Sequence, residues 1–164
     1  MACMFLTLVL LILVLIVGRE VNEAKRWIHL GFINIQPAEV LKLCWILYFS
    51  SYTCRKIYEV QSRLSGFIKP MIFIAVISLM LLAQPDFGSL VVITCITFGI
   101  LFVAGAGLLK YIATLTIVGV IGGILVMIQP YRMRRILSFL DPWEDQFGAG
   151  YQLTQSLMAF GRGG

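Results

Sequence analysis

Charged residues are scarce in this sequence. Only 13 % of its 164 residues are Asp, Glu, Lys or Arg, whereas 60 % are hydrophobic. In soluble globular domains roughly a quarter of the residues are charged. A water-soluble fold could not cover so much apolar surface, so we expect lipid to be the solvent for most of the chain.

Familiar catalytic and metal-binding motifs are also missing from the sequence. His29 is the only histidine, and the cysteines have no metal-ligand spacing. There is no nucleophile elbow, phosphate-binding loop, zinc motif or Ser/His/Asp set, which excludes the enzyme classes that depend on them. The four cysteines lie in or at the ends of apolar runs and are most simply small residues facing lipid or the core.

Long apolar runs predict five membrane-spanning helices. A helix needs about 20 apolar residues to cross a bilayer. The expected spans cover residues 1–18, 37–54, 67–84, 87–105 and 108–129. The first run lacks the cationic start and the cleavage site of a signal peptide, so we interpret it as a retained helix. Short connectors imply antiparallel neighbours. The predicted fold class is an all-α membrane protein, a polytopic bundle of about five transmembrane helices.

The charges lie mainly in the connectors. The net charge of +5 on a membrane protein indicates anionic headgroups or an anionic lipid substrate rather than nucleic acid. The 18–36 connector mixes charged and apolar residues, which suits a segment at headgroup depth. The first, third and last connectors hold seven Lys and Arg residues and the other two hold five. The positive-inside rule would therefore place the last connector, residues 130–164, in the cytoplasm.

A polar cluster surrounds the start of the second expected span. It comprises Lys25, Arg26, Trp27, Gln36, Glu39 and Lys42. Glu39 and Lys42 are three residues apart and share a helix face. Such charges are costly in a membrane helix unless they pair or face a polar cavity. Two interpretations stay open: an ion pair with Lys42 snorkelling to the interface, or a cavity wall that receives a charged group of the substrate.

Three further polar groups each allow two interpretations. Asp86 either caps the helix that follows it or lines a site. Arg132, Arg134 and Arg135 either anchor a helix end to anionic lipid or bind a phosphate or pyrophosphate, because a guanidinium bonds two oxygens at once. The acids within 141–145 lack a known ligand spacing, so solvated side chains are preferred to a metal site. From the residues alone, an enzyme acting on a lipid phosphate and a transporter of one remain equally open.

Five strings of residues nevertheless resemble a known family. They are G-R-E-V-N-x-A-K-R-W-I (18–28), N-I-Q-P-A-E-x-x-K (34–42), Q-P-D-F-G (84–88), Y-R-M-R-R-x-x-S-F-L-D-P-W-E-D (131–145) and G-Y-Q-L-T-Q-S-L-M-A-F-G-R-G (150–163). In order and spacing they closely resemble the SEDS family of bacterial cell-wall polymerases (FtsW/RodA/SpoVE), most closely its cell-division branch. The resemblance covers essentially the whole chain, with departures at Glu23, where the family usually has Gly, and at Gln146, where it usually has Pro.

The resemblance implies an architecture. The chain is expected to be an internal fragment of a ten-helix fold, equivalent to its spans three to seven, with residues 130–164 opening a large extracytoplasmic loop. The implied location is the bacterial cytoplasmic (inner) membrane at the division septum, with residue 1 inside. This orientation is opposite to the one that the basic-residue count prefers.

The resemblance also implies a function. The intact protein is expected to be a peptidoglycan glycosyltransferase that polymerises lipid II, an undecaprenyl-pyrophosphate-linked disaccharide pentapeptide, into glycan strands during septum formation. The alternative is a lipid II flippase. The implied partners are a class B penicillin-binding protein of the FtsI type, other divisome proteins and membrane lipids, with no nucleic acid.

The implied site follows the matching strings. The expected substrate-binding residues are Lys25, Arg26, Trp27, Gln36, Glu39, Lys42, Asp86, Arg132, Arg134, Arg135, Tyr151, Gln152, Gln155 and Ser156. Glu39 would orient Lys42 in a cavity open to the outer face, and the arginines would lie near the donor pyrophosphate. Arginines or a divalent cation such as Mg²⁺ would neutralise the leaving group. The family's catalytic aspartate belongs to an H-T-D-F-type segment expected beyond Gly164, so we expect no catalytic residue here and no activity from the fragment alone.

Overall fold

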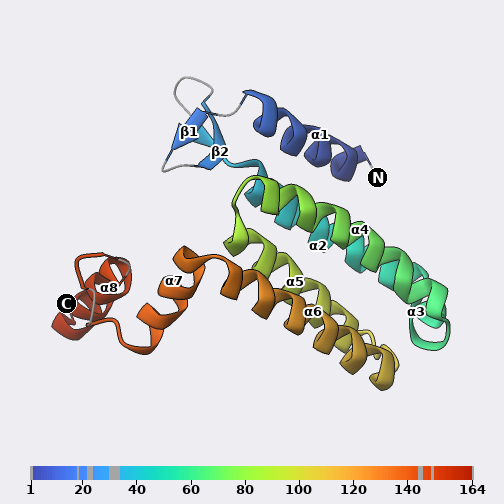
Figure 1. Cartoon of the computed structure of the whole chain (residues 1–164). Coiled ribbons are helices and arrows are strands. Elements are labelled where there is room, and N and C mark those ends of the chain that lie inside the picture. Colours follow the sequence, from blue (N-terminus) through green and yellow to red (C-terminus); the bar gives the residue numbers. More distant parts are fainter. Residues whose placement is uncertain are drawn as a thin grey trace. The chain divides into compact units, whose positions relative to one another are not determined.

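The chain forms a helical structure in two compact units. The structure, a computed structural model, describes residues 2–17, 19–21, 24–29, 34–143, 146–148 and 150–163. The units are Met1–Ile112 and Ala113–Gly164, and each is described by itself. Figure 1 shows the order of the elements along the chain.

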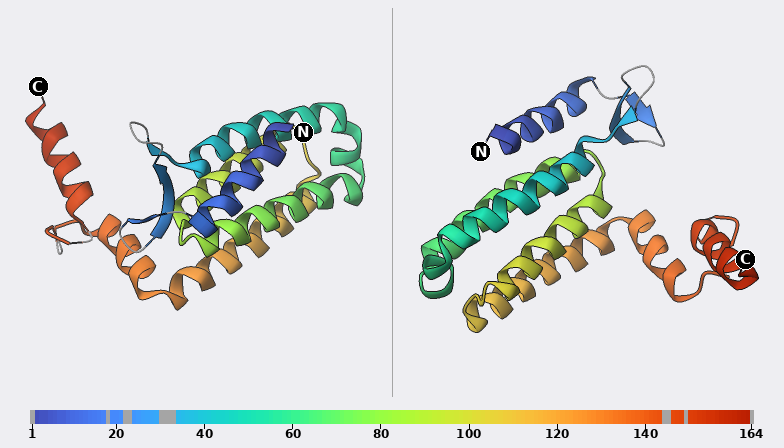
Figure 2. Two further views of the ribbon diagram at one scale, coloured as in Figure 1. Left: turned by 90° about the horizontal axis from the view of Figure 1, so that it is seen from above. Right: turned by 180° about the vertical axis from the view of Figure 1, so that it is seen from behind.

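The first unit is a bundle of long helices. It contains α1 (Ala2–Val17), α2 (Pro37–Arg55), α3 (Ile57–Ser62), α4 (Leu64–Ala83), α5 (Phe87–Val103) and the start of α6 (Leu108–Ile128). Helix α2 packs against α1 and α5, and α4 packs against α3 and α5 (Figures 1 and 2). Helices α2 and α5 begin at the end of the bundle where α4 stops, which we call the Asp86 end. Helix α3, the start of α4 and the α5–α6 turn form the opposite end, which we call the Gln61 end.

A small antiparallel sheet joins α1 to α2. Its strands are β1 (Arg19–Val21), β2 (Ala24–His29) and β3 (Asn34–Ile35), in the order β1-β2-β3. Strand β2 pairs Lys25 with Glu20 on one side and Ile28 with Ile35 on the other. The sequence did not predict these strands, because segments of three, six and two residues carry almost no period-2 signal. They are the one departure from an all-α fold among the described residues.

The core of the first unit is built on one face of α2. Leu41, Trp45 and Phe49 are fully buried and recur every four residues, the spacing that keeps side chains on one helix face. The Trp45 ring stacks on Phe73 of α4, with centroids 5.9 Å apart and planes 7° apart. The Trp45 indole N–H donates a 2.8 Å hydrogen bond to the Thr97 hydroxyl of α5. One buried aromatic residue thus joins three helices.

Helix α4 begins earlier than the sequence suggested. The expected span starts at residue 67, yet the helix starts at Leu64 and carries Pro70 in its interior. A proline has no N–H to donate to the carbonyl four residues before it, here the carbonyl of Gly66. The Tyr52 hydroxyl of α2 donates to that carbonyl at 3.0 Å instead. The helix passes through the proline because a neighbouring side chain replaces the missing donor.

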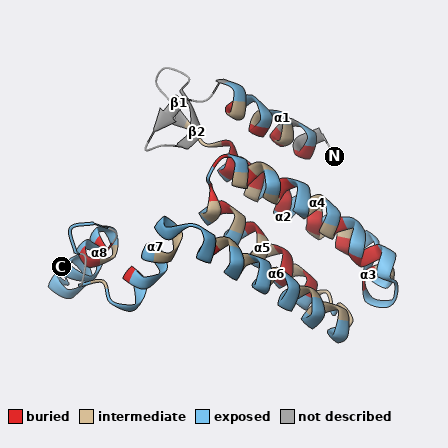
Figure 3. Cartoon of the chain, viewed as in Figure 1, coloured by how far each residue is buried: buried red, intermediate tan, exposed pale blue. Residues whose placement is uncertain are grey.

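The helices are apolar outside the core as well. On α4, Ile68, Ile72, Val76 and Leu79 form an exposed stripe, with Leu79 68 % exposed (Figure 3). By length and composition, α4 and α6 could each cross a membrane, and α1 and α5 contain shorter apolar stretches. Exposed apolar surface of this extent is typical of a protein solvated by lipid.

The second unit contains most of α6 followed by two amphipathic helices, α7 (Pro130–Leu140) and α8 (Tyr151–Arg162). On α7, Met133, Ile136, Leu137 and Leu140 follow the i, i+3, i+4, i+7 spacing of one apolar face. Pro130 stands at the first position of α7, where its missing N–H costs nothing. The sequence predicted residues 130–164 as a loop and did not predict α7 and α8.

Candidate functional site

Asp86 organises the Asp86 end of the first unit. It is the N-cap of α5, and its carboxylate accepts hydrogen bonds from the Ser89 backbone N–H at 3.2 Å and the Ser89 hydroxyl at 2.7 Å. Gln36, at the N-cap of α2, donates from Nε2 to the same carboxylate at 3.3 Å. Asp86 is only 5 % exposed. The capping interpretation is therefore confirmed. Asp86 also holds Gln36 in place, although the two residues are 50 positions apart in the sequence.

A second buried amide strengthens this end. Gln84 is 2 % exposed, and its Nε2 donates to the Leu11 carbonyl of α1 at 3.0 Å. The hydrogen bonds of Gln84 and Asp86 join the turn before α5 to α1 and to the start of α2. Sequence reasoning did not assign roles to Gln84 and Ser89. The Asp-x-x-Ser spacing was a readable signal for Ser89, since a capping residue is often bonded to the third residue after it.

Glu39 and Lys42 form an ion pair one turn into α2. The Lys42 ammonium lies 2.7 Å from Glu39 Oε1. The Lys42 side chain is 20 % exposed and that of Glu39 is 60 % exposed. This confirms that the two residues share a face. The pair is compatible both with Lys42 snorkelling to the interface and with a cavity wall that receives a charged group of the substrate. The Glu39 backbone N–H donates to the Gln36 carbonyl at 3.0 Å, and within the described residues no side-chain hydrogen bond or ion pair joins the Glu39–Lys42 pair to Asp86.

Three arginines of the second unit, Arg132, Arg134 and Arg135, lie on α7. Arg134 and Arg135 are exposed; Arg135 lies opposite the apolar face of the helix and Arg134 lies at the edge of that face. Arg132 is half-buried and donates from Nη1 to the Leu125 carbonyl of α6 at 2.9 Å. One arginine therefore ties α7 to the helix before it, whereas two present their guanidinium groups to the surroundings.

The predicted polar residues of α8 share one face. Tyr151, Gln152, Gln155 and Ser156 fall within less than half a turn of the helix circumference, and all four are exposed. The opposite side carries Leu153, Leu157 and Phe160. Thr154 is fully buried and donates to the Gly150 carbonyl, which secures the first turn of α8. Helix α8 thus presents a strip of hydrogen-bonding groups.

Some predicted residues lie outside what the structure describes. The backbone of Lys25, Arg26 and Trp27 forms part of β2, but their side chains are not described. Glu144 and Asp145 are also outside the described residues. Among the residues that are described, no three His, Cys, Asp or Glu side chains gather closely enough to hold a metal ion.

The family model of FtsW/RodA/SpoVE cell cycle proteins matches residues 1–164. The chain is 55 % identical over 156 residues to the probable peptidoglycan glycosyltransferase FtsW of Tolumonas auensis, covering 94 % of this chain and 40 % of that protein. It is 50 % identical over 157 residues to the protein of the same name from Escherichia coli O6:H1, covering 96 % of this chain and 38 % of that protein. The chain thus spans about two fifths of the length of the curated relatives it matches.

Solved structures agree with this assignment. A chain from a structure described as "Structural coordination of polymerization and crosslinking by a peptidoglycan synthase complex" superposes with a TM-score of 0.70 at 31 % identity, covering 94 % of this chain and 46 % of that one. The rod shape determining protein RodA of Thermus thermophilus gives 0.61 at 29 % identity, covering 73 % and 39 %. The predicted polytopic helical membrane fold is confirmed. This chain belongs to the FtsW/RodA/SpoVE family of cell cycle proteins.

Proposed function

We propose that this chain is part of a peptidoglycan glycosyltransferase that polymerises lipid II into glycan strands at the division septum of the bacterial inner membrane. The observation that carries the proposal is the 55 % identity, over 94 % of this chain, to a protein named as a probable peptidoglycan glycosyltransferase. The structural similarity to a chain of a peptidoglycan synthase complex supports it independently.

The reaction sets clear electrostatic demands. A sugar hydroxyl attacks an anomeric carbon, a new C–O bond forms, and the bond to the polyprenyl pyrophosphate breaks. The hydroxyl needs a base to accept its proton, and the departing pyrophosphate needs positive charge. We propose that the base is supplied by a carboxylate from a part of the protein beyond this chain. Cations of this chain serve the pyrophosphate.

In the first unit, Lys42 is the cation best prepared for this task. Its side chain is mostly buried, and Glu39 fixes its ammonium at 2.7 Å. A cation that is already held in place loses little conformational entropy when an anion binds. Partial burial strengthens its electrostatic attraction for that anion. Lys25, Arg26 and Trp27 are proposed to line the same cavity. Gln36 is proposed to bond the sugar or peptide of the substrate, with Asp86 as the positioning residue that orients it.

In the second unit, Arg134 and Arg135 are proposed to contact the pyrophosphate or the lipid path. A guanidinium matches two phosphate oxygens at once, and both side chains are exposed. Arg132 acts chiefly by fixing α7 to α6. The exposed strip of Tyr151, Gln152, Gln155 and Ser156 is proposed to hydrogen-bond the saccharide or peptide part of the substrate.

The test is polymerisation of labelled lipid II by the full-length protein, together with a class B penicillin-binding protein. We expect glycan strands from the parent protein and at least tenfold less polymer from Lys42→Met. Lys69→Met, which removes the same charge from α4, should retain activity. Translocation of labelled lipid II in proteoliposomes without any polymer formation would instead support a flippase. Equal activity of the two lysine variants would remove Lys42 from the site.

A further inference from the structure

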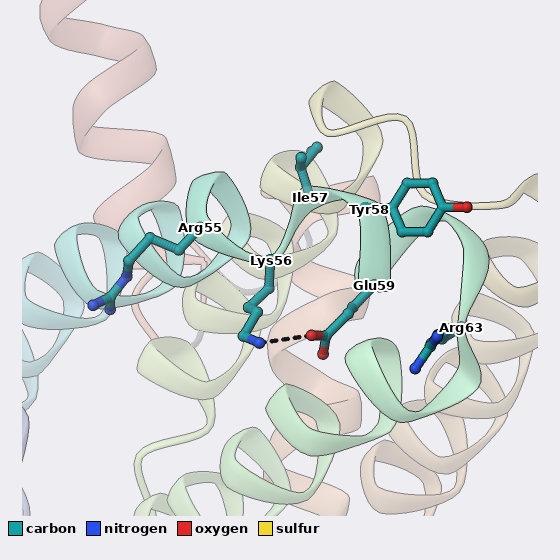
Figure 4. Close-up of a pocket in the computed structure, with 6 residues that line it drawn as sticks. All are labelled: Arg55, Lys56, Ile57, Tyr58, Glu59 and Arg63. Atoms are coloured by element: carbon teal, nitrogen blue, oxygen red, sulfur yellow. Dashed lines mark hydrogen bonds and ion pairs between the residues drawn. The ribbon is translucent and has the colours of Figure 1, made fainter.

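A hollow lies at the Gln61 end of the first unit, where α2 passes into α3. Its volume is about 290 Å³, and it is lined by Arg55, Lys56, Ile57, Tyr58, Glu59 and Arg63 (Figure 4). Organic ligands usually occupy cavities of roughly 300–1,000 Å³. The hollow therefore suits one small group, such as a phosphate, rather than a whole cofactor. None of its residues takes part in the proposed polymerisation.

The lining carries an excess of positive charge. The lining contains three cations and one carboxylate, with Arg55 turned away from the others and donating from Nε to the Ser51 carbonyl (Figure 4). The carboxylate is already engaged, because the Lys56 ammonium lies 2.6 Å from Glu59 Oε1. An ammonium has three N–H donors, so Lys56 keeps two for another acceptor. No described residue accepts a hydrogen bond from the Arg63 guanidinium, whose five donors remain available. The hollow is built to receive an anion.

Four contacts fix the shape of the hollow. The Arg63 backbone N–H donates to the Glu59 carbonyl at 2.9 Å, and Val60 between them is fully buried. Gln61 donates from Nε2 to the Ala104 carbonyl at 2.8 Å, and Lys110 donates to the Gln61 carbonyl at 3.1 Å. Helix α3 also lies so close to α4 that a Cβ at Gly66 would come within 2.5 Å of the Glu59 carbonyl oxygen. The cations therefore stand on a rigid base rather than on a loose connector.

The surroundings of the hollow indicate a lipid. It lies between α2 and α4, two helices of the membrane bundle, at the point where the chain leaves one and enters the other. Its apolar walls are Ile57, 39 % exposed, and Tyr58, 72 % exposed. Tyrosine is favoured at headgroup depth, and basic residues there attract anionic phospholipids.

We propose that this hollow binds the phosphate of an anionic phospholipid headgroup. Arg63 and Lys56 contact the phosphate oxygens, Arg55 adds to the local positive potential, and Tyr58 and Ile57 face the start of the acyl chains. Glu59 is a positioning residue, since it holds the Lys56 ammonium at the rim. The site goes beyond the proposed polymerase function and does not depend on it.

The test uses the full-length protein purified in detergent and follows thermal unfolding while lipid is added. Phosphatidylglycerol should raise the unfolding midpoint by roughly 5 °C when its concentration far exceeds the dissociation constant. Phosphatidylcholine and inorganic phosphate at equal concentration should each give less than a third of that shift. Arg63→Gln should weaken phosphatidylglycerol binding about fivefold. Arg162→Gln removes one exposed charge from the last turn of α8 and should weaken it less than twofold.

Each alternative outcome overturns the proposal in its own way. Equal shifts with both lipids would mean general solvation, and an equal shift with inorganic phosphate would mean a free-phosphate site. Equal losses for Arg63→Gln and Arg162→Gln would mean a diffuse surface charge. If Arg63→Gln is not monodisperse, Arg63→Lys replaces it: keeping the charge but losing the two-pronged donor, it should show an intermediate loss of about twofold. Unchanged binding in Arg63→Lys and a second variant, Lys56→Gln, would remove both cations from the site.

Discussion

The Tyr52 hydroxyl occupies the place that a backbone N–H would hold in an uninterrupted helix. It donates to the Gly66 carbonyl, which Pro70 leaves without its helical donor. In the bilayer core no water is present to donate a hydrogen bond to an unpaired carbonyl. A single side chain on α2 therefore permits a proline inside α4.

Replacing this hydroxyl tests the role directly. Tyr52→Phe should lower the free energy of unfolding by about 1 kcal/mol, because the Gly66 carbonyl loses its donor. Tyr48→Phe is the matched control, since no described residue is hydrogen-bonded to the Tyr48 hydroxyl. In a Pro70→Ala background the helix regains its N–H, so the cost of Tyr52→Phe should shrink. An SDS unfolding titration measures the parent and the four variants, and an undiminished cost in the Pro70→Ala background would contradict the explanation.

Glu59 predicts a response of stability to acid. The hydrogen bond from Lys56 lowers the pKa of the Glu59 carboxyl, and it outweighs an opposing contribution from burial. A carboxyl whose pKa is lowered by folding stabilises the folded state above its unfolded pKa of about 4.3. That stabilisation is lost as the pH falls through the lowered folded-state value. Unfolding measured from pH 6 to pH 3 should therefore show a smaller acid dependence in Glu59→Gln than in the parent protein. Identical pH profiles would rule out this contribution.

At the scale of the elements, the α2–α5 contact depends on one buried hydrogen bond. The Trp45 indole N–H is fully buried and finds its acceptor in Thr97. Thr97→Val keeps the shape of the side chain but leaves the indole N–H without an acceptor. The free energy of unfolding should therefore fall by about 1–3 kcal/mol. Thr94→Val is the control, because the Thr94 hydroxyl only donates to the Leu90 carbonyl of its own helix. Equal effects of the two substitutions in thermal unfolding would show that the bond between the helices adds nothing.

The elements also show what sequence could and could not predict. Apolar runs predicted the long helices because length and hydropathy are local properties, and the Asp86 cap was recognisable because its partner is three residues away. The hydroxyl that replaces the missing donor at Pro70 comes from α2, a contact that the sequence did not predict. The Gln36–Asp86 bond joins residues 50 apart, and the hollow depends on Gln61 reaching the α5–α6 turn. Contacts of this range are set by packing, which one sequence does not display.

At the scale of the whole molecule, the structure makes the topology testable. Gln61 bonds to Ala104, so α3 lies at the end of the bundle where α6 begins. Helix α6 has 21 residues, and at about 1.5 Å per residue it can cross the apolar layer of a bilayer. Residues on α3 and residues that follow α6 should therefore face opposite sides of the membrane.

Single cysteines placed in a cysteine-free full-length protein can check this. Ser62→Cys on α3 and Gln152→Cys on α8 are both exposed positions. In intact cells whose outer membrane has been made permeable, a membrane-impermeant maleimide should label Gln152→Cys and leave Ser62→Cys unlabelled until lysis. The opposite pattern would favour the orientation that the basic-residue count prefers. Labelling of both before lysis would contradict a membrane crossing by α6.

The Tyr52–Gly66 bond also bears on how the protein is made. A ribosome delivers α2 to the membrane before α4, so the hydroxyl that completes α4 is already in place when the proline-bearing helix emerges. Without α2, helix α4 would enter lipid with the Gly66 carbonyl lacking a hydrogen-bond donor. The helix that supplies the donor is thus synthesised before the helix that needs it.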